Sequence, residues 1–262
     1  MLVLLPPSEG KATVGAGPAV DLASLSLPGL TGTRSTVLAE LVELCSGDEE
    51  KAAEVLGLSP GLRGEVAKDA GLLTAPTLPA GELYTGVLYD ALGLATLSPA
   101  ARKRAKDSLL VFSGLWGAVR ITDRIPSYRC SMGVKLPALG ALGAYWREPM
   151  AGVVPEAAGD GLVLDLRSSA YANAWKPKPR SEPAARTATV RVLQVTVVDG
   201  VEKRSVVSHF NKATKGRLVR ALLESGAKPK TPAKLAATLR DLGFVIEEQA
   251  PGKLDVLVTE IH

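Results

Sequence analysis

The sequence predicts a mixed α/β fold of the α+β type, built as one compact domain around a mixed central sheet. Short apolar runs typical of buried strands stand alone in some segments, and in others two such runs flank a turn as a β-hairpin. Helical segments lie between them without the regular alternation of a doubly wound sheet. No convincing linker interrupts the 262 residues, so we expect a single domain over residues 1–262 with a helical hairpin at about 33–70.

Composition and charge narrow the classes to which the protein can belong. A formal net charge of +4 permits an anionic partner without requiring one. Cys45 and Cys130 are far apart and form no CxxC or Cys/His cluster, which argues against a disulfide scaffold and a zinc site. The apolar run at the N-terminus is too short for a signal peptide, and no stretch reaches the ~20 apolar residues of a membrane helix. We expect a cytoplasmic protein without a membrane partner.

The first strand and the turn after it place polar residues at a strand exit. Residues 2–5, "LVLL", predict a buried strand, and "PPSEGK" predicts the turn that follows. Ser8, Glu9 and Lys11 then lie where a core strand ends, a common place for a pocket. Residues 12–32 are rich in Gly, Pro, Ser and Thr, and we expect an ordered surface excursion there.

Amphipathic helices joined by a small-residue turn are expected next. Apolar spacing predicts a helix from residue 33 to 46 and a short helix over 48–56. The segment "VLGLSPGLRGEVAKD" then enters a further helix through a hairpin that exposes backbone N–H groups, on which a phosphate can dock. An ordinary helical hairpin that packs its leucines fits the same residues. The candidate anion-binding residues of this hairpin are Gly57, Ser59, Gly61 and Arg63.

The middle of the chain combines helices with core strands. "LYTGVLYDAL" continues in helical register, and "LSPAARKRAKD" adds a helix with Ser98 as its N-cap and Pro99 at the first helical position. "SLLVFSG" and "GLVLDLRSS" predict two buried strands. Between these strands lies "SGLWGAVRITDRIPSYR", which carries Arg120, Arg124 and Arg129 but no histidine.

The last part of the chain predicts two hairpins and two helices. Residues 187–210 alternate apolar side chains around an Asp-Gly pair typical of a type I′ turn, and a shift in the alternation predicts a bulge near Leu193. Asn211 then caps a helix, and "TPAKLAATLRDLG" predicts another. A closing hairpin is expected around residues 251–252.

Motifs for hydrolysis, nucleotide binding and metal binding are missing from the sequence. His209 and His262 belong to no metal-ligand spacing, and His209 is expected in a strand as a half-buried polar neighbour. Ser113 follows a strand but lacks the GxSxG elbow, so a triad would have to recruit His209. Neither a Walker A motif nor a GxGxxG motif after a strand is present. We therefore expect no cofactor and no metal, and we assign no catalytic residue.

Positive charge at turns and strand ends is the remaining signal. We predict that three basic clusters converge on one rim if the strands before them run the same way. Arginine donates two hydrogen bonds to a phosphate and lysine supplies a mobile charge, so such a rim would bind phosphates. The alternative is a solvated surface with scattered charges. The clusters are Arg120, Arg124 and Arg129; Lys176, Lys178 and Arg180; and Lys212, Lys215, Arg217 and Arg220.

Four motifs together resemble the peroxide stress protein YaaA family. They are "LYTGVLYDAL", "FSGLWGAVRITDRIPSYRCSMG", "LDLRSSAYANAWKP" and "VVSHFNKATKGRLVRALLES", in the order and approximate spacing of that family. Two segments depart from it: "PPSEGK" stands where many members read "SPAKT", and "IPSYR" stands where "MQPYR" is usual.

The resemblance implies a cytoplasmic protein of oxidative stress defence that limits free iron and binds DNA. It also implies a positively charged cleft and a helix-hairpin-helix element, which would fall on Gly57, Leu58, Ser59 and Gly61. The cleft would draw on Arg124, Arg129, Lys176, Lys178, Lys212, Lys215 and Arg217. No catalytic mechanism comes with the family.

Three functional hypotheses follow. The leading one is binding of double-stranded DNA through its phosphate backbone, with weak sequence preference. The rival is an enzyme that acts on a small phosphorylated or carboxylated ligand, with Ser8, Glu9 and Lys11 in its pocket and Glu9 or Asp123 as acid or base. The third is direct iron handling, for which only carboxylates could supply ligands.

Overall fold

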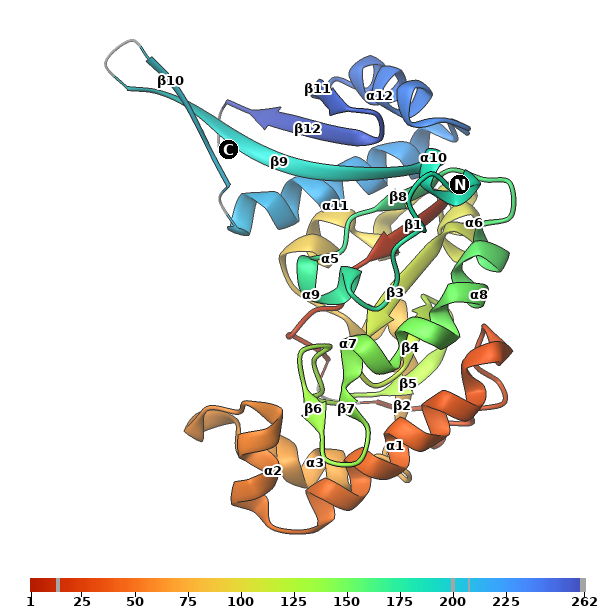
Figure 1. Ribbon diagram of the computed structural model, residues 1–262, viewed down its shortest axis with the longest axis vertical. Coiled ribbons are helices and arrows are strands. Elements are labelled where there is room, and N and C mark those ends of the chain that lie inside the picture. The colour runs from red at the N-terminus through yellow and green to blue at the C-terminus, as the bar shows by residue number, and fades with distance from the viewer. Residues whose placement is uncertain (13–14, 199–200, 207, 260–262) are drawn as a thin grey trace.

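A mixed sheet forms the centre of the computed structural model, which describes residues 1–12, 15–198, 201–206 and 208–259 (Figure 1). The strand order is β11-β12-β9-β8-β1-β3-β4, and β10 pairs with β9. Strands β12, β9, β8, β1 and β3 run parallel, whereas β4, β10 and β11 are antiparallel to their neighbours. The strands are β1 (Leu2–Leu5), β3 (Leu109–Ser113), β4 (Gly117–Arg120), β8 (Val163–Asp165), β9 (Thr187–Val198), β10 (Val201–Ser205), β11 (Val245–Ala250) and β12 (Lys253–Val258).

Helices surround this sheet, and two small sheets lie apart from it. The α-helices are α1 (Thr31–Ser46), α2 (Glu49–Leu56), α3 (Gly64–Ala70), α4 (Ala80–Leu83), α5 (Val87–Leu92), α6 (Pro99–Ser108), α7 (Leu142–Tyr145), α8 (Arg147–Ala158), α9 (Ser169–Ala172), α10 (Glu182–Ala185), α11 (Ser208–Ser225) and α12 (Pro232–Asp241). Short 3-10 helices are η1 (Pro28–Leu30), η2 (Pro60–Leu62) and η3 (Leu94–Thr96). The small sheets pair β2 (Thr77–Pro79) with β5 (Arg124–Pro126) and β6 (Lys135–Leu136) with β7 (Gly140–Ala141). No helix in the described part of the chain is long and apolar enough to cross a membrane.

The inner strands carry the core because both of their faces are covered. Every residue of β1 and of β3 is buried, as expected for parallel strands that read as continuous apolar runs. The predicted strands at residues 2–5 and in "SLLVFSG" are thus confirmed, and the third, in "GLVLDLRSS", is confirmed over Val163–Asp165. The fold is a mixed α/β arrangement, as predicted.

The position of β1 determines where a site can form. From β1 the chain first adds β3 on one side and later β8 on the other, so the order of the parallel strands diverges at β1. Because the three strands run the same way, their carboxyl ends meet at one edge of the sheet. In open α/β sheets, ligands bind at such a divergence, beyond the carboxyl ends of the strands.

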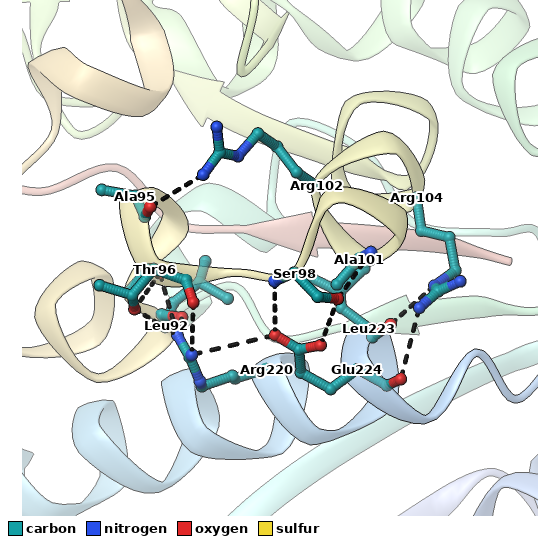
Figure 2. A network of polar contacts seen from close by, with 11 residues as sticks. Leu92, Ala95, Thr96, Ser98, Ala101, Arg102, Arg104, Arg220, Leu223 and Glu224 are labelled. Atoms are coloured by element: carbon teal, nitrogen blue, oxygen red, sulfur yellow. Dashed lines mark hydrogen bonds and ion pairs between the residues drawn. The ribbon is translucent and has the colours of Figure 1, made fainter.

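Basic residues of α6 and α11 hold these helices together (Figure 2). Ser98 caps α6 by accepting a hydrogen bond from the Ala101 N–H, and its hydroxyl donates to Glu224 of α11 at 2.6 Å. Arg104 donates to the Leu223 carbonyl at 2.7 Å, and Arg220 donates to carbonyls just before α6. Arg104 of "RKRAK" and Arg220 of α11 are therefore used in packing. The predicted Ser98 cap is confirmed.

Helices α5 and α11 approach closely at Gly216, where a side chain would have no room. A Cβ there would lie 2.3 Å from the Leu88 carbonyl oxygen and 2.9 Å from the Ala91 Cβ. We expect Gly216→Ala to lower the free energy of unfolding by about 2 kcal/mol, because the helices must separate. Urea unfolding checks this result. The control is Gly152→Ala in α8, where no atom lies within 4 Å, and there we expect a gain of up to ~1 kcal/mol. Equal effects at both sites would contradict the explanation.

Three local predictions are wrong. The helix expected over 83–92 breaks between α4 and α5, because Gly86 has φ 96°. The strand expected up to residue 210 ends at Ser205, and α11 begins at Ser208, so Asn211 lies inside the helix and does not cap it. His209 is consequently helical.

The bulge expected near Leu193 is also wrong. The pairing of β9 runs unbroken along β12 and then along β10. The shift in apolar residues arises because Val192 and Leu193, on opposite faces of β9, are both buried. The Asp-Gly turn of this hairpin falls at 199–200, outside the described residues.

Candidate functional site

The exits of β1 and β8 border a pocket of about 460 Å³, which we call the edge pocket. This volume lies in the range typical of sites for small molecules. Its wall is formed by Pro6–Glu9 after β1, by Leu166, Ser168 and Tyr171 after β8, by Gly86–Leu88 at the start of α5, and by Asn211, Lys212 and Lys215 on α11. A hollow of about 520 Å³ beside α10 and α12 has only one charged lining residue, Glu248, and carries no comparable chemistry.

Two lysines of α11 face the edge pocket. The Lys215 ammonium donates a hydrogen bond to the Leu166 carbonyl at 3.1 Å, and burial lowers the pKa of Lys215 although Asp165 partly offsets this effect. An ammonium has three donors, so this contact leaves two for other partners. Lys212, one turn earlier, is exposed at the rim of the pocket.

An ion pair stands at the β1 side of the pocket. Arg129 contacts the Glu9 carboxylate at 2.9 Å, and the Arg129 backbone N–H donates to the Asp69 carboxylate at 2.9 Å. Glu9 remains largely exposed, whereas Asp69 is fully buried. Arg129 thereby connects Glu9 of the pocket wall with the buried Asp69, although the three residues are far apart in the sequence.

Lys11 is the most perturbed lysine of this region. Its ammonium donates to the Ser8 carbonyl at 3.0 Å and lies 4.5 Å from the ring centroid of Tyr128 and 5.7 Å from that of Tyr84. Burial lowers the pKa of Lys11 to about 8, while the Glu9 carboxylate acts in the opposite direction. Perturbed groups next to a pocket are candidates for functional residues.

A chain of buried hydroxyl groups holds the Tyr84 and Tyr128 rings next to Lys11. The backbone N–H of Trp116 donates to Ser113 Oγ at 2.9 Å, Ser113 Oγ is 2.6 Å from the Tyr128 hydroxyl, and that hydroxyl is 2.8 Å from the Tyr84 hydroxyl. All three hydroxyl groups lie in the interior, where burial raises the pKa of both tyrosines. This chain fixes the two rings over which the Lys11 ammonium lies.

Asp69 is a buried carboxylate with incomplete hydrogen bonding. Burial raises the pKa of Asp69 to about 7, and the hydrogen bond from Arg129 partly opposes this shift. Its second oxygen has no hydrogen-bond partner among the described residues. A carboxyl group that titrates near neutral pH therefore lies in the same electrostatic environment as Lys11.

The loop after β8 is anchored by Arg167. The Arg167 guanidinium forms two hydrogen bonds to Asp165, at 2.6 and 2.8 Å, and also donates to the Tyr171 and Trp175 carbonyls. Its central carbon lies 4.2 Å from the ring centroid of Phe112 on β3. The arginine thus organises the loop that carries Ser168 and Tyr171 into the pocket wall.

The predicted basic residues do not all gather at this edge. Arg120 pairs with Leu110 near the start of β3 and donates to the Asp107 carbonyl at 2.6 Å, so it lies toward the opposite edge of the sheet. Arg124 donates to the Thr77 carbonyl in the small β2-β5 sheet. Arg217 is exposed, but it is about 140° around α11 from Lys212.

Lys176 and Lys178 follow α9, next to the pocket. The Lys176 ammonium donates to Asn173 at 3.2 Å, and Lys178 is exposed two residues later. Tyr171 of α9 lines the pocket, and the exposed pair follows it by five and seven residues in the chain.

The segment of the predicted helical hairpin contains α2, a turn with η2, and α3. Gly57 has φ 65° and ends α2, and no atom lies within 4 Å of a Cβ placed on Gly57 or Gly61. Arg63 pairs with Glu50 at 3.4 Å on the surface, and Ser59 precedes η2. In Figure 1 the hairpin lies at the lower end of the molecule, far from α11 along the long axis.

Comparison with known proteins gives the family. The model of the peroxide stress protein YaaA family matches residues 1–250. The chain belongs to the peroxide stress protein YaaA family. A UPF0246 protein of Streptomyces coelicolor is 70% identical with full coverage of both chains. A UPF0246 protein of Corynebacterium efficiens is 44% identical over 94% of this chain and 95% of its own, and one of Ruegeria is 31% identical over 78% and 80%.

Some residues around the edge pocket were not singled out by the sequence analysis, although several of them lie within motifs of the YaaA family. Asp69, Tyr84 and Tyr128 were not predicted, because their partners are distant in sequence, and Arg167 was not predicted although Asp165, its carboxylate partner, is only two residues away. Arg167 and Tyr84 do lie inside the motifs "LDLRSSAYANAWKP" and "LYTGVLYDAL" by which the YaaA family is recognised. Motif membership was thus the one signal that could have pointed to them.

Proposed function

We propose that this YaaA family protein binds double-stranded DNA through its phosphate backbone as part of the peroxide stress response, limiting iron-dependent damage. The observation that carries the proposal is a set of exposed lysines, with Lys212 on the wall of the edge pocket and Lys176 and Lys178 in the segment after α9, which we place together at the rim. None of these lysines forms an ion pair with another described residue. Exposed lysines without a carboxylate partner can bind DNA phosphates and displace the counterions of the DNA. This gives affinity that does not depend on the base sequence.

The helical hairpin supplies a second surface for the same proposal. No atom lies within 4 Å of a Cβ placed on Gly61, so a phosphate can approach the backbone there, whereas the Gly57 N–H already donates to carbonyls of α2. The edge pocket itself is too small for a duplex, and DNA would therefore lie across its rim. Two separated contacts of this kind predict a site that spans several phosphates.

The test is fluorescence anisotropy of a labelled duplex between 50 and 200 mM salt. For Lys176→Ala/Lys178→Ala we expect the slope of log affinity against log salt to become shallower by about 1.8, because two phosphate contacts are lost. The control, Lys103→Ala/Lys106→Ala on α6, makes the same change in net charge and should have a much smaller effect. Gly61→Asp against Gly32→Asp tests the hairpin in the same assay, since both positions have room for a side chain.

Two results would contradict DNA binding at these surfaces. The first is the lack of any binding by the unaltered protein at 50 mM salt. The second is an equal loss of affinity in the rim variant and in the α6 control, which would indicate attraction to the overall charge rather than contact at the rim.

A further inference from the structure

The interior of the edge pocket differs from its rim. Lys215 lines the pocket, is partly buried, and is held by the Leu166 carbonyl rather than by a carboxylate. The nearby Asp165 is engaged in two hydrogen bonds with Arg167. Removing an ammonium from water without a counter-ion is costly, and an anionic ligand would offset that cost.

A second polar group of the wall is also unpaired. Asn211 lies one helical turn before Lys215 on the same side of α11 and lines the pocket. Its buried side-chain oxygen accepts no hydrogen bond from a described residue. A ligand hydroxyl or amine could donate to this oxygen while an acidic group of the same ligand meets Lys215.

Positive charge also exceeds negative charge around the pocket. Lys212 and Lys215 line it directly, and Lys11 contacts the carbonyl of Ser8, which is part of the wall. Glu9 is the only carboxylate among the lining residues, and it is paired with Arg129. The surplus favours a ligand with at least one negative charge.

We propose that the edge pocket binds a small molecule bearing a phosphate or carboxylate group, with Lys215 as its main cationic contact and Asn211 as a hydrogen-bond acceptor. The divergence of the strands at β1 and the volume of about 460 Å³ suit a metabolite rather than a polymer. This site shares Lys212 with the rim, but its main contacts, Lys215 and Asn211, line the interior and are not part of the proposed DNA surface. It adds a ligand to the proposed function without depending on it.

The test uses pyridoxal 5′-phosphate as a probe that joins a phosphate to an aldehyde. A lysine amine attacks the aldehyde carbon and water leaves, giving an imine, which borohydride then reduces to a stable secondary amine. Peptide mapping identifies the labelled lysine. We expect fast, saturable labelling of Lys11 or Lys212 while Lys215 holds the phosphate, and at least tenfold slower labelling by pyridoxal, which lacks the phosphate.

Competition at constant ionic strength separates the two acidic groups. Protection by inorganic phosphate assigns the site to phosphorylated ligands, and stronger protection by oxalate assigns it to carboxylates. Lys215→Met should weaken protection at least tenfold, whereas Lys234→Met on α12 should leave it unchanged. Asn211→Ala is a second variant if loss of Lys215 disturbs the fold. Labelling spread evenly over surface lysines and unaffected by either anion would overturn the proposal, whatever the result with DNA.

Discussion

Replacing Arg167 with alanine is expected to lower the free energy of unfolding by about 4 kcal/mol, because it leaves a half-buried carboxylate without its partner. The Arg167 side chain is fully buried and holds Asp165 through two short hydrogen bonds. It also satisfies the carbonyls of Tyr171 and Trp175. Arg167→Lys should recover little of the loss, since lysine lacks the planar fork that contacts these groups together.

Urea unfolding followed by tryptophan fluorescence measures this effect. Arg204→Ala is the matched control, because Arg204 also forms a bidentate pair, with Glu247, but at the surface. Exposed pairs contribute little, so the control should unfold close to the unaltered protein. Equal midpoints for the two variants would show that Arg167 does not anchor the loop.

Asp69 should make the protein less stable as pH rises from about 4 to about 7. Its pKa is about 7 when folded, against an ordinary value of 3.8, so within that window the folded protein keeps a proton that the unfolded chain loses. Stability from this group is complete below pH 4 and is lost as the buried carboxyl ionises, by up to about 4 kcal/mol. Asn cannot ionise, so Asp69→Asn should remove this part of the pH dependence and stabilise the protein at pH 8.

The measurement is the free energy of unfolding at a series of pH values. Asp107→Asn, at an exposed position of α6, controls for the general loss of a carboxylate and should leave the slope unchanged. Asparagine keeps the oxygen that accepts the Arg129 N–H, so the contact to the pocket region is retained. A slope between pH 4 and 7 that persists in Asp69→Asn would assign the titration to another group.

Local signals explain which elements the sequence predicts. The β1 strand is a continuous apolar run, and α6 and α12 are capped by Ser98 and Thr231, whose side chains accept hydrogen bonds from the first turns. Such features depend on neighbours in the chain. Helix α8 was not predicted, because its contacts are distant in sequence. Trp146 before it and Met150 within it pack tightly against Gly117 of β4.

The site was predictable only in part, because folding redistributes the arginine-rich stretch. Ser8 and Glu9 after β1, and Lys212 and Lys215 near the start of α11, do meet at one pocket. The β3-β4 hairpin, however, reverses the chain, so Arg120 lies toward the opposite edge from Ser113. The prediction assumed that basic residues following a strand stay near its carboxyl end. Here β4 runs back along β3 and carries Arg120 away from that end.

The pairing of β1 has a consequence for how the protein is made. Leu2 is beside Val163, and the pocket that starts at Pro6 is closed by residues near 212. A ribosome must therefore release most of the chain before the first strand finds its second neighbour, and contacts so distant in sequence slow folding. Nascent fragments that end before Lys215 lack part of the pocket wall, so a ligand that requires the pocket can bind only after that part of the chain has been made.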